Sequence, residues 1–257
     1  VKIVDFYICS MKWIRYFFSL LWRGWFFLVF LIVFFSFTPI LFFFTAIIKN
    51  PIVVFKLNCY WSRLMLWFSG IFYTVDYDEP LEKNVQYIFC PNHTSTLDIP
   101  LIAASIPFPI LYMGKVELTK IPIFGYFFKK NSVIVDRKNR KGSYQAFLNI
   151  GKKIDEGNNV CIFPEGGIPK SNVFLKKFKN GPFRLAIEKN IMLVPVTLPD
   201  NKRRFPQEYY KGSPGFVRVK VHKPIKINGK GENCVENLNS NVYSIIFEQL
   251  NYYEKGR

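Results

Sequence analysis

The sequence predicts an α/β protein, a mixed sheet flanked by helices, preceded by an N-terminal membrane-embedded helical segment. Half of the 257 residues are apolar, including 28 Phe, and the apolar residues are most concentrated before Gly70. After Gly70, short apolar strands alternate with helical patterns, which is typical of a sheet with helices on its faces. We therefore expect two regions: a membrane-associated helical segment over residues 1–70 and an α/β domain over residues 71–257.

The membrane prediction depends on residues 24–48, a run of 25 residues without a charge. A run of this length is typical of a segment inside a bilayer, and it is too long for the apolar part of a signal peptide. Pro39 leaves two arrangements: one kinked spanning helix, or two short helices that enter and leave the same leaflet. Cations precede and follow the run, which favours the second arrangement, with both ends on the cytoplasmic side.

Two neighbouring segments have an amphipathic pattern. Residues 11–23 mix aromatic and aliphatic residues with three cations, as in a helix that lies among lipid headgroups. Leu57, Trp61, Leu64 and Phe68 form a stripe at helical spacing. The stripe is compatible both with a membrane surface and with packing on the protein's own core.

The formal net charge is +17, which predicts a surface that attracts anions. Beside an embedded segment, an anionic membrane explains this charge best, and we expect a membrane-associated protein whose active site faces the cytoplasm (at the inner membrane in a bacterium). A basic module that grips nucleic acid or lipid without catalysis is the alternative, but no nucleic-acid motif accompanies the basic clusters. The five cysteines are scattered and form no CxxC pair, which indicates reduced thiols and no zinc site.

The pattern after Gly70 predicts the order of strands and helices. Apolar runs predict strands over residues 71–76, 85–90, 132–135, 160–163, 192–198 and 216–221. Helical patterns cover residues 95–105, 143–156 and 183–188, with a short helix at the C-terminus over 242–253.

One of only two histidines, His93, lies in the sequence NHTSTLD (residues 92–98), directly after a predicted buried strand. On a regular helix, positions i and i+5 point about 140° apart, so His93 and Asp98 meet only if His93 lies in the loop and folds back over the first turn. The carboxylate then fixes the imidazole tautomer and leaves the other ring nitrogen as a general base. The alternative is a histidine that merely caps a helix. The second histidine, His222, is expected on the exposed face of a strand.

Three further motifs follow in order. VIVDR (133–137) brings Arg137 out at the end of a strand, and FPEGG (163–167) places an acid and two glycines after another. LVPV (193–196) is a strand that contains a proline. Individually these motifs are compatible with a surface charge, a tight turn and a structural strand.

Together, NHTSTLD, VIVDR, FPEGG and VPV resemble, in order and spacing, the four blocks of the glycerolipid acyltransferases, most closely the 1-acylglycerol-3-phosphate acyltransferases. The resemblance covers about residues 55–225. It implies that His93 takes the proton from a glycerol hydroxyl, which attacks the thioester carbonyl of acyl-CoA or acyl-carrier protein, while Asp98 orients His93. It implies no covalent acyl-enzyme, no cofactor and no metal.

The resemblance also implies where the acyl acceptor binds. Arg137 is expected near its phosphate, with Lys115 of MGKVEL in the same pocket. Glu165, Gly166 and Gly167 are expected to take part in acceptor binding.

The third block departs from the family pattern at one point. The family continues through a Thr to an Arg that meets the phosphate, whereas this chain has Gly167 and Ile168. Lys170, two residues later, is a candidate substitute, although a lysine is a point charge and cannot bind a phosphate in the bidentate way of an arginine. The acceptor is therefore expected to be lysophosphatidate, with another lysophospholipid or a lyso-aminolipid as alternatives.

Overall fold

The computed structural model describes residues 2–136, 139–227, 229 and 231–256. Arg137, one of the predicted site residues, lies outside these ranges. The described chain contains a seven-stranded sheet in the order β1-β7-β6-β2-β5-β3-β4. Its strands are β1 (Ile71–Tyr77), β2 (Tyr87–Pro91), β3 (Ile110–Lys115), β4 (Ser132–Val135), β5 (Asn159–Cys161), β6 (Met192–Thr197) and β7 (Gly215–Val221).

The sheet is mixed. The five strands β6, β2, β5, β3 and β4 run parallel to their neighbours, while β7 pairs antiparallel with β6 and parallel with β1. The predicted fold class, a mixed sheet flanked by helices, is confirmed by this topology and by the likeness to a solved structure described below.

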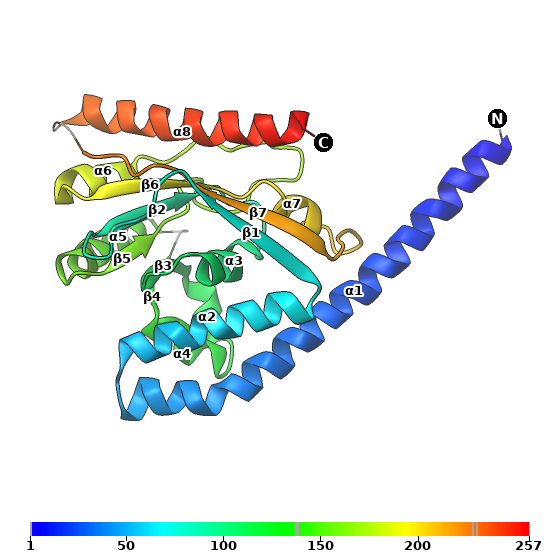
Figure 1. Cartoon of the computed structure of the whole chain (residues 1–257), viewed down its shortest axis with the longest axis horizontal. Coiled ribbons are helices and arrows are strands. Elements are labelled where there is room, and N and C mark those ends of the chain that lie inside the picture. Colours follow the sequence, from blue (N-terminus) through cyan, green and yellow to red (C-terminus); the bar gives the residue numbers. More distant parts are fainter. Residues whose placement is uncertain (1, 137–138, 228, 230, 257) are drawn as a thin grey trace.

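Helices cover both faces of the sheet (Figure 1). They are α1 (Lys2–Phe42), α2 (Pro51–Phe68), α3 (Asp98–Ser105), α4 (Phe124–Lys130), α5 (Arg140–Asp155), α6 (Gly181–Lys189), α7 (Asn201–Arg204) and α8 (Glu232–Lys255), with a π-helical turn η1 (Phe43–Ile47) and a 3₁₀ turn η2 (Val116–Lys120).

Alternation along the central strands divides the core in two. In β2, Phe89 packs in the cluster beneath α2 and α3, whereas its neighbour Ile88 packs in the cluster beneath α5, α6 and α8. All five residues of β2 are buried, because successive side chains point to opposite faces and both faces are covered by helices.

Several elements differ from the sequence expectation, and helices α4 and α7 were not predicted at all. β3 was not predicted, because prolines flank its start and its residues are mostly half-buried, which leaves no clear alternation of apolar and polar residues. The C-terminal helix α8 has 24 residues and begins at Glu232, ten residues earlier than expected. It packs along the sheet with a stripe of spaced apolar residues that includes Val235, Val242 and Ile246.

The favoured division of residues 24–48 into two short helices is wrong, whereas the expectation that both ends lie on the cytoplasmic side stays a prediction. Helix α1 continues through Pro39 to Phe42, and the chain reverses only after η1. Asn50 then begins α2, since its side-chain oxygen accepts hydrogen bonds from the backbone N–H groups of Ile52 and Val53, both at 3.1 Å. Residues 24–42 therefore lie in one continuous helix. After the reversal, the chain returns as α2, which packs beside α1.

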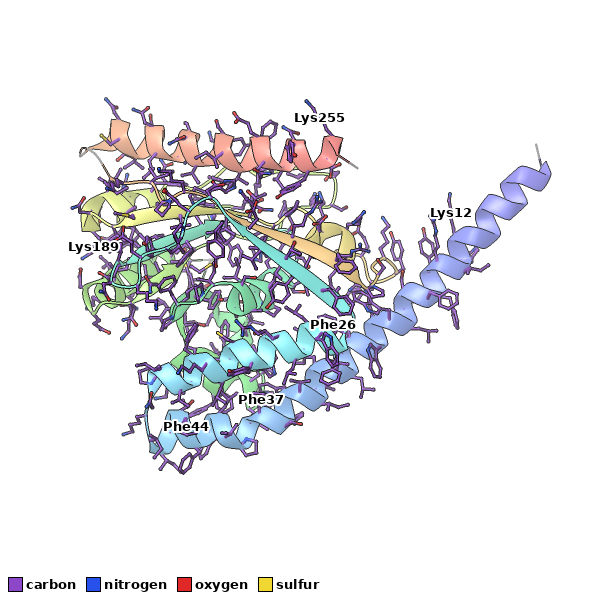
Figure 2. The ribbon with its side chains drawn as sticks, in the orientation of Figure 1. Lys12, Phe26, Phe37, Phe44, Lys189 and Lys255 are labelled. Atoms are coloured by element: carbon purple, nitrogen blue, oxygen red, sulfur yellow. The ribbon has the colours of Figure 1, made fainter. Side chains whose placement is uncertain are left out.

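In the described residues, one helical stretch, Lys12–Ile47, is long and apolar enough to cross a membrane by length and composition. Phe26, Phe37 and Phe44 lie where this stretch packs beside α2, whereas Lys12 lies on the part that extends away from the sheet (Figure 2). The rest of the helix carries exposed apolar side chains, such as Phe35 at 53% exposed. Its length and exposed apolar surface make this helix a candidate membrane segment.

The stripe predicted on α2 packs only in part on the protein's own core. Leu57 and Trp61 pack against buried clusters, whereas Phe68 is half exposed. The fully buried apolar residues of α2 are Val54, Cys59, Met65 and Leu66, which lie outside the stripe.

Candidate active site

The motifs identified in the sequence meet at one edge of the sheet. Parallel strands end at the same edge, where the loops after β2 and β5 carry His93 and Glu165 and where Lys115 ends β3. The carboxyl edge of parallel strands is where α/β proteins place their sites. The order of the strands therefore brings residues that are far apart in the sequence to the same edge of the sheet.

His93 lies in the loop between β2 and α3, and its Nδ1 is 2.8 Å from Oδ2 of Asp98. Because a carboxylate accepts only, Nδ1 carries the proton and donates it to Asp98. The other ring nitrogen, Nε2, has no hydrogen-bond partner among the residues that the structure describes. His93 is only 8% exposed, so its orientation is fixed by its surroundings. The pair has the geometry of an oriented general base.

Asp98 is held from several directions. Oδ2 also accepts from the backbone N–H groups of Thr94 (2.7 Å) and Ser95 (3.0 Å), and Oδ1 accepts from the side-chain amide of Asn201 (2.7 Å). These bonds explain why α3 begins at Asp98 and not at Ser95 as expected. The loop folds onto the carboxylate, which brings residues five apart in the sequence together.

Glu165 lies at the same site but does not face an acceptor. Its side chain is fully buried, and its two oxygens accept from the backbone N–H groups of His93 (2.6 Å) and Lys176 (3.1 Å). Burial raises the pKa of this carboxyl to about 7. In this geometry Glu165 holds the loop that carries His93, and its expected contact with the acceptor stays a prediction.

The ring of Phe163 stacks on His93, with the ring centroids 4.0 Å apart. Asn92, next to His93, exchanges two hydrogen bonds with the backbone of Leu198, at 2.7 and 3.1 Å. These contacts join the loop after β2 to the ends of β5 and β6.

The two glycines after Glu165 have backbone conformations that favour glycine over other residues. Gly166 has φ +72° and Gly167 has φ +154°, values that side-chain-bearing residues rarely adopt. A Cβ on Gly166 would lie 2.8 Å from Nζ of Lys179. The side chain of Lys179 therefore lies close against the backbone of Gly166.

A cavity of about 190 Å³ lies beside these residues. Its lining includes Phe163, Gly166 and Lys179 together with apolar side chains such as Met113 and Phe147. Lys179 is held there by its backbone N–H, which donates to the carbonyl of Pro164 at 2.9 Å.

The two lysines predicted to bind the acyl acceptor, Lys115 and Lys170, lie in different surroundings. Lys115 ends β3 at the catalytic edge, is about half exposed, and pairs with Glu117 at 3.5 Å. Lys170 is exposed in the loop after Ile168, and the lining of the cavity includes Lys179 instead.

Sequence reasoning missed Asn201, Phe163 and Lys179. Asn201 had a usable signal, because it follows a predicted buried strand at the same edge of the sheet. The other two had none, since a Phe within a strand and one lysine within a basic cluster are common features.

The second histidine was wrongly expected on an exposed strand face. His222 is buried, and its Nε2 is 2.8 Å from the hydroxyl oxygen of Thr197. It lies just past the end of β7, where the antiparallel pairing with β6 covers it.

A buried carboxylate that contacts an imidazole at the carboxyl edge of a parallel sheet is an arrangement that suits general-base chemistry in an α/β enzyme. The family model described as acyltransferase matches residues 73–199, from β1 to the end of β6. The chain belongs to this acyltransferase family.

The relatives agree with this assignment. The 1-acyl-sn-glycerol-3-phosphate acyltransferase of Cocos nucifera is 25% identical over 191 residues, covering 74% of this chain and 61% of the relative. The protein of the same name from Borreliella burgdorferi is 26% identical over 189 residues, covering 73% of this chain and 75% of the relative. This chain therefore spans less than two thirds of the Cocos nucifera protein.

A solved structure shows the same fold. The 1-acyl-sn-glycerophosphate acyltransferase from Thermotoga maritima superposes with a TM-score of 0.77 at 21% identity, covering 95% of this chain and 98% of that one. The likeness extends beyond the sheet into the N-terminal helices.

Proposed function

We propose that this protein transfers a fatty acyl group from a thioester donor to the free hydroxyl of 1-acylglycerol-3-phosphate, giving phosphatidate for phospholipid synthesis. The observation that carries the proposal is the contact between His93 and Asp98, which leaves Nε2 available to a substrate hydroxyl. The names of the relatives support the choice of acceptor.

In this reaction, Nε2 of His93 takes the hydroxyl proton as the oxygen attacks the thioester carbonyl. The tetrahedral intermediate then collapses, the C–S bond breaks, and the thiolate leaves with the proton returned by His93. Asp98 stabilises the imidazolium that forms between these steps, and Glu165 holds the backbone of His93 in place. Direct attack requires neither an acyl-enzyme nor a metal nor a cofactor, and the thioester is acyl-CoA or acyl-carrier protein.

The acceptor's phosphate is proposed to bind among the cations at the catalytic edge. Lys115 and Arg137 follow β3 and β4, and Gly166 and Gly167 let the backbone approach the ligand closely. Lys179 is better placed than Lys170 to replace the missing arginine, because its ammonium group lies against Gly166.

A second acceptor class has one observation in its favour. Ile168 stands where the family has an arginine, so one phosphate contact is lost at this position. A lyso-aminolipid or another lysophospholipid would need that contact less than lysophosphatidate does.

We also propose that the active site faces the cytoplasm, at the inner membrane in a bacterium. The exposed apolar side chains of α1 and the net charge of +17 suit an anionic bilayer surface. The acyl donor is an acidic, water-soluble molecule of the cytoplasm, so it reaches the site from that side.

The test uses the purified full chain with one acyl-CoA and a panel of acceptors: lysophosphatidate, three other lysophospholipids and a lyso-aminolipid. Release of the free thiol and the mass of the product are measured together. We expect the highest kcat/KM with lysophosphatidate. A faster reaction with the lyso-aminolipid would overturn the choice of acceptor, and thiol release without any acylated product would overturn the transfer itself.

A further inference from the structure

Arg23 is a buried cation on the apolar helix α1, where residues 12–21 before it are mostly exposed. It was expected among lipid headgroups, yet it is only 4% exposed. Its guanidinium donates to the backbone carbonyls of Lys211 (2.8 Å), Pro206 (2.5 Å) and Glu208 (3.0 Å). It also lies over the ring of Phe205, 4.3 Å from the centroid.

The segment that Arg23 binds has little regular structure of its own. Residues 205–214 connect α7 to β7 without a helix or strand. Three hydrogen bonds from one guanidinium therefore set much of its path, and bonds from a charged donor are stronger than neutral ones. Phe26 adds an aromatic contact with Phe205, with ring centroids 4.5 Å apart.

The same segment holds the catalytic loop. The carbonyl of Phe205 accepts a hydrogen bond from the hydroxyl of Ser95 at 2.6 Å, and the backbone N–H of Ser95 donates to Asp98. Asn201, at the start of α7 just before this segment, donates to the other oxygen of Asp98. Phe205 thus contacts Arg23 with its ring and Ser95 with its carbonyl.

We propose that Arg23 is a positioning residue that links the seating of the membrane helix α1 to the geometry of the His93–Asp98 pair. When α1 is seated, Arg23 holds residues 205–211 in the position where Phe205 anchors Ser95. When this contact is lost, Ser95 and Asn201 lose their support, and Asp98 no longer orients His93. In its effect on turnover, this inference rests on the proposed acyl transfer.

The alternative is that Arg23 only fastens α1 to the α/β domain. A fastening residue would affect stability and the folded fraction but would leave each folded molecule with an unchanged catalytic pair. The measurements must therefore report on His93 itself.

The first experiment compares Arg23→Met with Arg15→Met, which removes an exposed charge from the same helix. Both are made in the full chain, in vesicles that contain anionic lipid, and rates are normalised to folded protein. We expect Arg23→Met to lower kcat by about ten- to a hundredfold, the effect of losing charge-assisted hydrogen bonds, with less than about threefold change in the acceptor's KM. Arg23→Lys should restore only part of the rate, since an ammonium group cannot bind these carbonyls and stack on Phe205 in the same way. An unchanged kcat for Arg23→Met, or an equal loss in Arg15→Met, would overturn the proposal.

The second experiment does not depend on the substrate. The chain has only two histidines, so a His222→Asn background leaves His93 as the one imidazole visible by ¹⁵N NMR. We expect a single Nδ1–H tautomer in this background and a mixture of tautomers after Arg23→Met. If Arg23→Met folds poorly, Phe205→Leu tests the same link. An unchanged tautomer in a folded variant would contradict the inference, whereas absence of acyl transfer by the unaltered chain would contradict only the proposed function.

Discussion

His93 and His222 are both buried beside an aspartate, but their two ring nitrogens are used differently. In His93, Nδ1 contacts Asp98 at 2.8 Å and Nε2 has no partner in the described part of the chain. In His222, Nε2 contacts Thr197 at 2.8 Å and Nδ1 lies 3.5 Å from Asp78. A general base needs a ring nitrogen that is not already bonded, and in the described residues Nε2 of His93 meets this condition whereas Nε2 of His222 does not.

The surroundings of the two imidazole rings also favour His93, and not His222, as the base. His93 is at the carboxyl edge of the parallel strands, stacked on Phe163, close to a cavity. His222 is covered at the junction of β6 and β7, and burial lowers its pKa, so it stays neutral over a wider pH range. A histidine near an aspartate is therefore not enough to indicate catalysis, and the place in the sheet decides.

The largest expected effect contrasts the histidines directly. His93→Ala should lower kcat/KM by about 10²- to 10⁴-fold, the contribution of general-base catalysis, while His222→Asn should stay within about threefold of the unaltered rate. Thiol release with saturating acyl-CoA measures both, and circular dichroism checks that both fold. Comparable losses in the two variants would remove the distinction, as would full activity of His93→Ala.

The next effect concerns the aspartates. Asp98→Asn should lower kcat by about 10²-fold, because an amide no longer fixes the Nδ1–H tautomer or stabilises the imidazolium. Asp78→Asn, the matched change beside His222, should leave kcat unchanged. The pH–rate profiles of the two variants check this, and a loss confined to Asp78→Asn would reverse the comparison.

A smaller effect separates two lysines near the site. Lys179→Met should raise the acceptor's KM by about tenfold, the cost of removing one charge-assisted hydrogen bond, with the donor's KM unchanged. Lys170→Met should change neither, because Lys170 is exposed and does not line the cavity. A higher acceptor KM in Lys170→Met alone would restore Lys170 as the substitute for the missing arginine.

The remaining predictions concern stability and not the rate of the reaction. Glu165 has a folded-state pKa of about 7 against an ordinary 4.5, so between these values the folded chain holds a proton that the unfolded chain releases. The free energy of unfolding therefore decreases as pH rises through this window, by an amount on the order of 3 kcal/mol. Glu165→Gln should flatten this slope in urea titrations from pH 5 to 7. A slope that persists in Glu165→Gln would show that another group causes it.

His222 gives the free energy of unfolding the opposite dependence on pH. Its folded-state pKa lies below the ordinary 6.5, so the unfolded chain takes up a proton first as pH falls below 6.5. The stability that neutral His222 contributes is present above pH 6.5 and decreases below it. His222→Asn should reduce this loss in the same titrations, and an unchanged acid slope would contradict the assignment.

Much of the α/β domain could be predicted, because strands such as Ser132–Val135 are continuous apolar runs bounded by polar residues. β3 could not, since its partial burial gives no periodic signal. The contact between His93 and Asp98 was predictable from their spacing together with three other motifs. The contacts of Glu165 with the backbone N–H groups of His93 and Lys176 were not, because the sequence does not show that this side chain turns inward.

The sequence by itself determined the local features of this protein: an uncharged apolar run, a buried strand that ends just before His93, and an aspartate five residues after His93. These depend on neighbours along the chain. Only the tertiary structure decided that Nε2 of His93 has no partner among the described residues, that His222 is covered, and that Arg23 reaches residues 205–211. Each of these depends on contacts between segments more than 20 residues apart, which packing of the sheet and helices selects and local sequence patterns do not encode.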